Sequence, residues 1–301
     1  MSLASLAMYA SPPALEEATD LLWAYIRDEL RAAGLRSVPD RLDKLVRHDD
    51  AWLQPNLLLS QTCGYPYVLR LRGHVRLVAT PEYDYPGCVG PLKCSFVVVP
   101  KESRFQTLAD LRGARAAINH PESNSGTNLF CALVAPQAEN GRFFSSVVET
   151  GSHNASLRFV SSGLADVASI DCITYGNILR FEPRLVEGVR IIAETPKGPG
   201  LPYITRATAT DEELSILRAA LAAVADDRRM DEVRDTLGLR KFSVLEDADY
   251  QHCWTLGAKR RAWVIRRLPS LIFRVERDDL SDAIGVERNE NRERLCLFVS
   301  A

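Results

Sequence analysis

The chain has 301 residues, of which 46% are hydrophobic and 25% charged, as in ordinary globular proteins. Its formal net charge of -2 supplies no global basic field, so we expect no nucleic acid among its partners. The sequence contains no run of about 18 consecutive apolar residues, so we predict no membrane insertion.

The N-terminal stretch MSLASLAMYASPPALEE lacks both the charged start and the long apolar core of an export signal. As written, the sequence indicates a cytoplasmic protein, or a periplasmic one if a natural signal was trimmed. Seven cysteines are scattered without a CxxC pair, which argues against a disulfide framework and a structural zinc site. We therefore expect neither a metal nor a cofactor.

The N-terminal part of the chain alternates between strand and helix patterns. Residues 3–9 predict a short apolar strand, and a helix follows in which Ser11 is the cap, Pro12 the first residue and Gly34 the end. Brief apolar runs then predict two buried strands, at 56–60 and 75–80. This alternation is typical of a mostly parallel sheet with helices on its faces.

The same alternation continues through the middle of the chain. The predicted elements are a strand at 94–100, a helical turn at 107–113, a strand at 114–119, a strand–loop–helix–strand unit across 149–171, a strand at 189–196 and a helix at 211–227. Thr210 or Asp211 caps the last of these helices.

This order of elements predicts an α/β protein of two lobes, with mixed sheets, flanking helices and a ligand cleft between the lobes. Residues 1–95 and 195–301 form a discontinuous first lobe, and residues 96–194 are inserted as the second. Two crossing strands, near 94–100 and 189–196, would join the lobes and act as a hinge.

The segment 251–301 fits this scheme less well. We predict a helix over 255–267, where basic and apolar residues mix. Such a stretch can touch a membrane or a partner, but a solvated or packed helix face is the more common reason for it.

Polar residues crowd one predicted helix start, in the stretch HPESNSGTN at 120–128. The first N–H groups of a helix lack partners, and the macrodipole adds about half a positive charge there. Gly126 lets a ligand approach the backbone, while Ser125 and Thr127 add hydroxyls. The stretch therefore suits an oxyanion without any lysine, although simple N-capping explains the same residues equally well.

Two further positions are candidates for the same site. His153 lies in the first turn of a helix that Ser152 caps, where a neutral imidazole donor is favoured; a surface histidine is the plainer interpretation. Asp171 ends a predicted strand, at the sheet edge where ligands collect in α/β proteins, or else caps the next helix.

A third helix start, SQTCGYPY at 60–67, offers donors and aromatic walls. Thr62 contributes a hydroxyl, the backbone at Cys63 and Gly64 can face the cleft, and Tyr65 adds a ring with a polar end. A cysteine at a helix start can be reactive, but no base is predicted beside Cys63, so a nucleophilic role is the weaker alternative.

Three stretches together resemble a known family: SNSGTNLF at 123–130, TGSHNASLRFVSSGLADVASIDCITYG at 150–176 and TPKGPGLPYIT at 195–205. They look like the phosphate/phosphite/phosphonate-binding proteins of ABC transporters, which have the type 2 periplasmic-binding-protein fold. The resemblance extends over residues 4–250. It implies two α/β lobes that close on a ligand, in agreement with the nested order of elements.

The resemblance also implies roles for individual residues. Ser125, Gly126 and Thr127 would hold the phosphonyl oxygens, His153 would contact the anion, and Asp171 would occupy the acidic position that receives a ligand amine in aminoalkylphosphonate binders. From the first lobe, Tyr9 and the segment Thr62–Tyr65 would close the site. We count Asn124 and Ser95 among the ligand-binding residues as well.

We therefore predict a non-catalytic binding protein for phosphonate, phosphate or phosphite. Its partners would be the small oxyanion and an ABC transporter permease or a signalling protein, and it would be a monomer or weak dimer. The alternatives are a cytoplasmic enzyme on the same fold, acting for example in menaquinone- or thiamine-precursor metabolism, and a ligand sensor. No nucleophile–base–orienter trio is evident in the sequence, which favours binding over catalysis.

Overall fold

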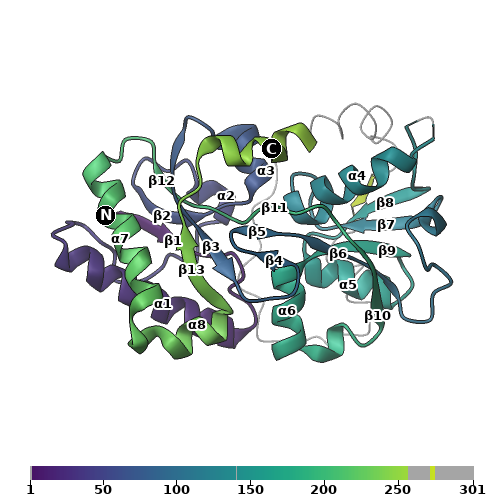
Figure 1. Ribbon diagram of the computed structural model, residues 1–301, viewed down its shortest axis with the longest axis horizontal. Helices are drawn as coiled ribbons and strands as arrows, with labels where there is room; N and C mark the ends of the chain where they lie inside the picture. The colour runs from purple at the N-terminus through teal and green to yellow at the C-terminus, as the bar shows by residue number, and fades with distance from the viewer. Residues whose placement is uncertain (1, 140, 257–271, 275–301) are drawn as a thin grey trace.

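The computed structural model describes residues 2–139, 141–256 and 272–274. It shows two α/β halves side by side, each built on its own sheet, with a small third sheet between them (Figure 1). The predicted fold class is confirmed: both sheets mix parallel and antiparallel pairs, and helices flank them.

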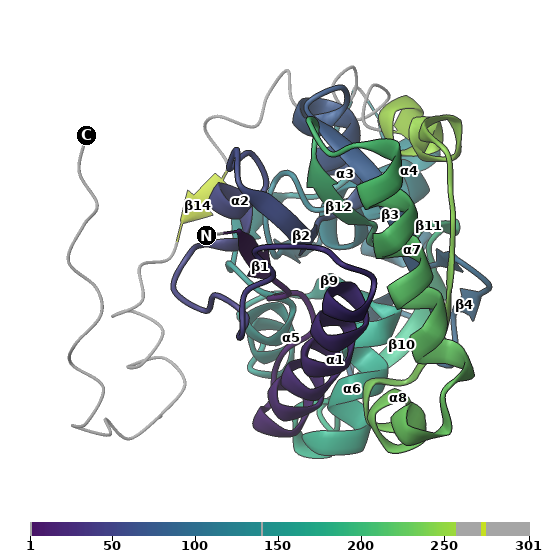
Figure 2. The ribbon, with the colours of Figure 1, turned by 90° about the vertical axis from the view of Figure 1, so that its left-hand side faces the viewer.

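The first half is built on a five-stranded sheet in the order β1-β2-β12-β3-β13. Its strands are β1 (Leu3–Ser5), β2 (Leu57–Gln61), β3 (Val75–Tyr83), β12 (Tyr203–Arg206) and β13 (Leu239–Ser243). The helices α1 (Pro13–Ala32), α7 (Asp211–Asp226) and α8 (Asp231–Leu237) pack on one face (Figure 2). In α1 the apolar residues recur at helical spacing and are buried: Leu15, Leu22, Ile26 and Leu30.

The opposite face of this sheet carries shorter elements. These are α2 (His48–Ala51), α3 (Gly64–Pro66), the π-helical turn η1 (Tyr67–Leu71) and the 3-10 turn η7 (Asp247–Tyr250). Trp52, Tyr67 and Tyr250 form the centre of the apolar cluster on this side. The first sheet is therefore covered on both faces.

The second half is built on a six-stranded sheet in the order β10-β6-β9-β7-β8-β14. Its strands are β6 (Ser95–Pro100), β7 (Arg115–Ile118), β8 (Ser146–Glu149), β9 (Val167–Asp171), β10 (Val189–Glu194) and β14 (Ile272–Arg274). The remaining elements here are α4 (Leu129–Val134), α5 (His153–Ser161), α6 (Cys172–Phe181) and the short turns η2 (Ala109–Leu111), η3 (Asn124–Asn128), η4 (Ala135–Gln137) and η5 (Pro183–Leu185). Strand β14, from the C-terminal segment, pairs with β8, so part of the predicted first lobe lies on the second sheet.

The chain crosses between the halves through a three-stranded sheet rather than through the two strands we predicted. Strands β4 (Cys88–Val89), β5 (Leu92–Lys93) and β11 (Gly198–Pro199) form it, in the order β11-β5-β4. The predicted crossing strands, β6 and β10, instead pair with each other inside the second sheet. The apolar run of β6 reflects its burial inside this sheet, whereas β10 is a partly exposed edge strand, so neither strand pattern carries information about the crossing.

The observed helix caps agree with the predicted ones at α7 and differ at α1. Thr210 caps α7 in a capping box with Glu213, as expected from a threonine followed three residues later by glutamate. The predicted start of α1 was wrong by one residue: Pro12 is the cap, Pro13 the first helical residue, and the cap makes no side-chain hydrogen bond. Only 255 and 256 of the predicted 255–267 helix lie within the described residues, and both are helical.

Another 3-10 turn, η6 (Arg228–Met230), links α7 to α8. Among the described residues, no helix is long and apolar enough to cross a membrane.

Candidate functional site

We call the three-stranded sheet β11-β5-β4 the linker sheet. A buried ion pair lies where this linker sheet meets the second half. The Lys93 ammonium contacts Asp171 Oδ2 and donates to the Tyr9 hydroxyl at 2.6 Å, while that hydroxyl donates to Asp171 Oδ1 at 3.1 Å. Lys93 is 2% exposed and Asp171 1%. Charged groups that are buried this deeply require a partner of opposite charge, and Lys93 and Asp171 are such partners for each other.

The network fixes the charges of its three members. Burial works to raise the pKa of Asp171, but the Lys93 ammonium, His153 and the hydrogen bonds to the carboxylate together outweigh it, and the pKa is lowered. Burial likewise works to lower the pKa of Lys93, and Asp171 reverses this shift. For Tyr9, burial and then the Asp171 charge raise the pKa well above its usual value. At neutral pH the site therefore holds an ammonium, a carboxylate and a neutral phenol.

Asp171 also has a structural role, since it caps α6. Its Oδ1 accepts hydrogen bonds from the backbone N–H groups of Ile173 at 3.0 Å and Thr174 at 3.2 Å. The sequence left Asp171 as either a helix cap or a residue of the ligand site. In the structure it caps α6 and also lies at the carboxyl end of β9, beside the predicted site.

Ser125 and His153 are brought together from two different helix starts. Ser125 lies in η3, which continues into α4, and its Oγ is 3.2 Å from His153 Nε2 in the first turn of α5. Ser152 caps α5 as predicted, accepting from the Ala155 N–H at 3.1 Å. Burial lowers the pKa of His153 to about 4, so the imidazole is neutral at pH 7.

The side chains of Asn119 and His153 pack closely against Gly126. A Cβ at this position would lie 2.0 Å from Asn119 Oδ1 and 3.1 Å from His153 Cε1. Only glycine therefore lets Asn119, at the end of β7, approach this helix start. Among the described residues, Asn119 Oδ1 and His153 Nδ1 are buried without a hydrogen-bond partner.

The other predicted residues of the second half take varied positions. Ser95 is paired with Asp171 in the β6–β9 register, and its buried Oγ has no partner among the described residues. Thr127 directs its hydroxyl to the backbone, donating to the His120 carbonyl at 2.7 Å. Asn124 accepts a hydrogen bond from the Asn128 side chain at 2.9 Å. The Thr127 hydroxyl is thus committed to a local contact.

The predicted residues of the third helix start, in the first half, are mostly structural in their contacts. Thr62 is fully buried and Tyr65 belongs to the apolar cluster beside η1. A Cβ on Gly64 would lie 3.1 Å from Cys253 Sγ, so this glycine faces the interior. Cys63 does reach the second half, because the Asn124 N–H hydrogen-bonds its thiol; burial nevertheless raises the pKa of Cys63 to about 11.

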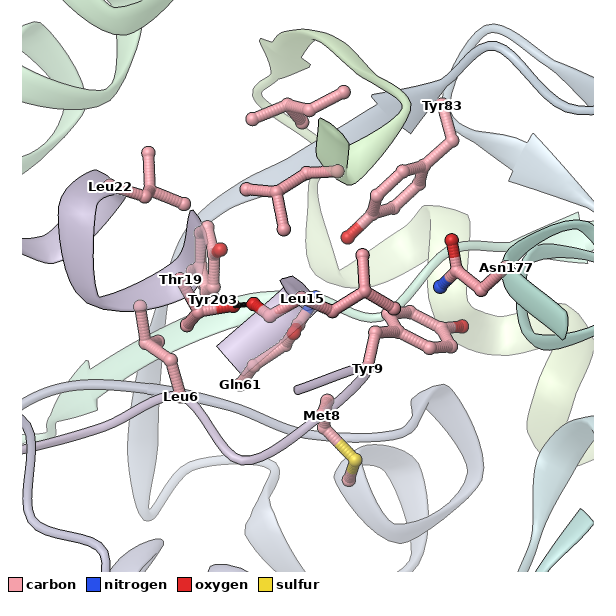
Figure 3. A pocket seen from close by; sticks show the side chains of 12 residues that line it. Leu6, Met8, Tyr9, Leu15, Thr19, Leu22, Gln61, Tyr83, Asn177 and Tyr203 are labelled. Carbon is pink, nitrogen blue, oxygen red and sulfur yellow. Dashed lines mark hydrogen bonds between the residues drawn. The ribbon is translucent and has the colours of Figure 1, made fainter. Parts of the chain in front are cut away.

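A small cavity adjoins Tyr9 on the side of the first half (Figure 3). Its polar lining includes Thr19, Gln61, Tyr83 and Asn177. At about 20 Å³ it has room for roughly one water molecule. This cavity is therefore too small to hold a phosphonate.

Sequence reasoning missed Lys93 and Asn119. Lys93 follows the Gly- and Pro-rich linker VGPL, and no periodicity marks it as buried. A single lysine directly before a strongly apolar strand was the available signal. Asn119 precedes the HPESNSGTN stretch, and nothing local indicates that it packs on Gly126.

Chemically, the arrangement supplies hydrogen bonds rather than a nucleophile. A serine–histidine pair acts as a nucleophile when a third group orients the imidazole. In the part of the chain that is described, His153 Nδ1 has no such partner, and Asp171 is already engaged by Lys93. Ser125 and His153 both lie in the first turn of a helical element, where the dipole favours an anion. Ser123 and Ser152 cap these two starts by accepting from the N–H groups of Gly126 and Ala155.

Comparison with known proteins agrees with the family resemblance seen in the sequence. The model of the family described as "ABC transporter, phosphonate, periplasmic substrate-binding protein" matches residues 6–250. No curated protein sequence matches significantly.

Among the described residues, no group of three or more His, Cys, Asp or Glu side chains is arranged to hold a metal ion.

Several solved structures share the fold. A binding-protein component of an ABC phosphonate transporter from Pseudomonas aeruginosa is 16% identical with a TM-score of 0.67, covering 86% of each chain. PhnD1 from Prochlorococcus marinus in complex with methylphosphonate is 16% identical with a TM-score of 0.65, covering 86% of this chain and 98% of its own. A Xanthomonas citri protein bound to ATP is 18% identical with a TM-score of 0.64, covering 87% and 98%.

Proposed function

Since the chain belongs to the family of phosphonate-binding periplasmic substrate-binding proteins of ABC transporters, we propose that it captures a phosphonate, phosphate or phosphite anion between its two halves. Binding proceeds by closure about the linker sheet, and the bound anion is passed to a transporter permease. The protein acts as a monomer or weak dimer and carries out no chemistry on its ligand.

The observation that supports this proposal most directly is the meeting of two helix starts at Ser125 and His153. The 3.2 Å contact places a hydroxyl and a neutral imidazole beside the N–H groups that begin η3 and α5. We assign the oxyanion to the Ser125 hydroxyl and the His153 imidazole; the Gly126 N–H donates to Ser123 Oγ at 3.1 Å and would have to exchange that acceptor for the ligand. Tyr9 and Cys63, from the first half, contact Asp171 and Asn124 of the second half, and closure keeps them over the ligand.

Lys93 narrows the proposed ligand class. Its ammonium occupies Asp171 Oδ2, while Asp171 Oδ1 accepts from Tyr9 and from two backbone N–H groups. Each oxygen of the carboxylate therefore already accepts a hydrogen bond, and Lys93 compensates its charge, so a ligand amine would have to share the carboxylate with Lys93 or displace it. We accordingly place alkylphosphonates, phosphite and phosphate above aminoalkylphosphonates.

Titration calorimetry with methylphosphonate, phosphite, phosphate, 2-aminoethylphosphonate and sulfate tests this ranking. We expect Ser125→Ala to weaken binding of the best ligand about tenfold, because hydrogen bonds to a charged group are worth about 1.5–3 kcal/mol. Ser162→Ala, at the far end of α5, serves as the matched control and leaves affinity unchanged. Unaltered affinity in both Ser125→Ala and His153→Gln would show that the anion binds elsewhere.

A further inference from the structure

Three thiols gather beside the ion pair, and the proposed function uses none of them. Cys88 begins β4, Cys94 lies immediately before β6, and Cys172 begins α6. The Cys88 and Cys172 sulfurs are 3.6 Å apart. A Cβ on Gly87 would lie 2.8 Å from the Cys94 sulfur and 3.2 Å from that of Cys172, so the cluster packs around this glycine.

Backbone contacts hold the cluster in place. The Cys172 N–H donates to the Cys94 carbonyl at 3.2 Å, continuing the β6–β9 ladder in which Ser95 faces Asp171. Cys88 faces Lys93 across the β4–β5 hairpin. The Cys88–Cys172 contact and the Lys93–Asp171 ion pair therefore both join the linker sheet to the start of α6.

The environments of these thiols differ in the way a reactive pair requires. Hydrogen bonds from Cys88 and then Cys94 lower the pKa of the Cys172 thiol, which also lies at a helix N-terminus. Cys88 is partly exposed, whereas Cys94 and Cys172 are buried. The hydrogen bond with Cys172, and then burial, raise the pKa of Cys88, so Cys172 is the thiolate of this pair. Burial raises the pKa of Cys63 to about 11 and that of Cys253 to about 12, which keeps both protonated at neutral pH.

We propose that Cys88 and Cys172 are an oxidisable dithiol, which a peroxide converts into a disulfide between the linker sheet and α6. The Cys172 thiolate attacks hydrogen peroxide and forms a sulfenic acid, and the hydroxide that leaves takes up a proton to become water. The Cys88 sulfur, losing its proton, then attacks the Cys172 sulfur and displaces a second hydroxide, which also takes up a proton to become water. In total, two thiols and one peroxide give one disulfide and two waters.

Closing the bond requires the sulfurs to move from 3.6 Å to about 2.05 Å, a shift that side-chain rotation and a small hairpin movement can supply. The bond would tie the hairpin that carries Lys93 to the helix that Asp171 caps. This inference is independent of the proposed ligand, because its readout is a covalent bond.

Peptide mapping tests it, because trypsin separates the three cysteines. Cleavage after Arg and Lys places Cys88 on residues 77–93, Cys94 on 94–101 and Cys172 on 159–180. The full reduced chain is treated with hydrogen peroxide, its free thiols are blocked with N-ethylmaleimide, and it is digested without reductant. We expect peptide 77–93 linked to 159–180, and the link lost on treatment with dithiothreitol.

Cys88→Ser and Cys172→Ser should each abolish this linked peptide, whereas Cys131→Ser, a buried cysteine elsewhere in the second half, should leave it unchanged. The wild-type map needs no variant, so a variant that fails to fold does not obscure the result. Recovery of both peptides as blocked thiols or sulfinic acids, without a link, would overturn the proposal. A link from 94–101 to 159–180 as the main product would overturn the assignment of Cys88.

Discussion

At the scale of single residues, the buried ion pair between Lys93 and Asp171 couples two side chains that are distant in the sequence. Each charge is buried, and each is held in its charged form by the other. Removing one partner from such a pair leaves an uncompensated charge, which costs far more than the pair contributes when intact. The two residues should therefore behave as one unit.

We predict that Lys93→Met lowers the free energy of unfolding by roughly 3–5 kcal/mol, because it leaves the Asp171 carboxylate buried without a cation. The double variant Lys93→Met/Asp171→Asn should recover a large share of this loss. Asparagine keeps an oxygen to accept from the N–H groups of Ile173 and Thr174, so the cap of α6 survives. Urea unfolding of the two single variants and the double variant measures the coupling.

Lys101→Met, a change to an exposed lysine at the end of β6, provides the matched control and should be nearly neutral. Additive losses in the double-variant cycle would show that Lys93 and Asp171 are stabilised by separate neighbours.

His153 makes stability depend on pH. Burial lowers its pKa from 6.5 to about 4 in the folded protein, whereas the unfolded chain protonates it near 6.5. Between these values the unfolded state binds more protons than the folded state, so the free energy of unfolding falls as pH falls. We predict that His153 accounts for a loss of roughly 1–3 kcal/mol between pH 6.5 and pH 4.5.

Urea unfolding at these two pH values, in the native protein and in His153→Gln, isolates the contribution of this side chain. His74→Gln supplies the control, because His74 is exposed on the turn before β3. An equally steep acid-side loss in His153→Gln would assign the effect to other groups.

At the scale of elements, the start of η3 packs against the end of β7 through Gly126 and Asn119. A Cβ on Gly126 would lie 2.0 Å from Asn119 Oδ1, a distance that forces one of the two to move. We predict that Gly126→Ala costs roughly 1–3 kcal/mol through overpacking. Gly126→Ala/Asn119→Ala should recover part of that loss, as the side chain in the way is removed. Thermal unfolding of both variants provides the comparison.

If the second substitution restores nothing, Gly126 is required for its close contact with His153, and Asn119 is incidental. The oxyanion affinity of the double variant then becomes informative. Full affinity would show that Asn119 only packs here, and lost affinity would make it part of the binding site.

Local signals predicted the individual elements well. The cap of α7, which the sequence left between Thr210 and Asp211 and which is Thr210, the Ser152 cap of α5 and the strand end at Asp171 all depend on residues within four positions of each other. Such short-range hydrogen bonds are encoded by sequence order, and a single sequence is enough to find them. The order of the elements predicted two lobes and the resemblance implied the same arrangement, and the structure has two halves, each on its own sheet.

Contacts between distant residues could not be predicted in the same way. Lys93 and Asp171 are 78 positions apart, and neither neighbourhood indicates that a lysine is buried. The crossing through β4, β5 and β11 involves strands of only two residues each, which are too short to carry any periodicity. Even the start of α1 was misplaced, because two consecutive prolines leave the first helical position ambiguous in the sequence.

At the scale of the whole molecule, Tyr9 joins the halves. It belongs to the segment between β1 and α1, yet its ring packs against the core of the second half and its hydroxyl bonds with Lys93 and Asp171. Its backbone has a φ of 61°, a conformation that non-glycine residues adopt at a cost, so the surrounding contacts must hold it there. The halves are therefore held together in part by one phenol group.

We predict that Tyr9→Phe shifts the ligand-free protein toward a more open arrangement and weakens oxyanion binding about tenfold. The lost hydrogen bonds to charged partners are worth about 1.5–3 kcal/mol each, and part of this energy favours the closed form over the open one. A ligand that needs the closed form must then supply the difference itself, which raises its apparent Kd. Calorimetry with the best ligand and small-angle X-ray scattering without ligand measure the two effects.

Tyr25→Phe is the matched control, since the Tyr25 hydroxyl bonds with Asp227 inside the first half, away from the linker sheet. Hinge closure predicts a larger radius of gyration for ligand-free Tyr9→Phe, which saturating ligand returns to the native value. Weaker binding with no change in scattering would instead mean that the Tyr9 hydroxyl contacts the ligand directly, and that the halves are held together by other contacts.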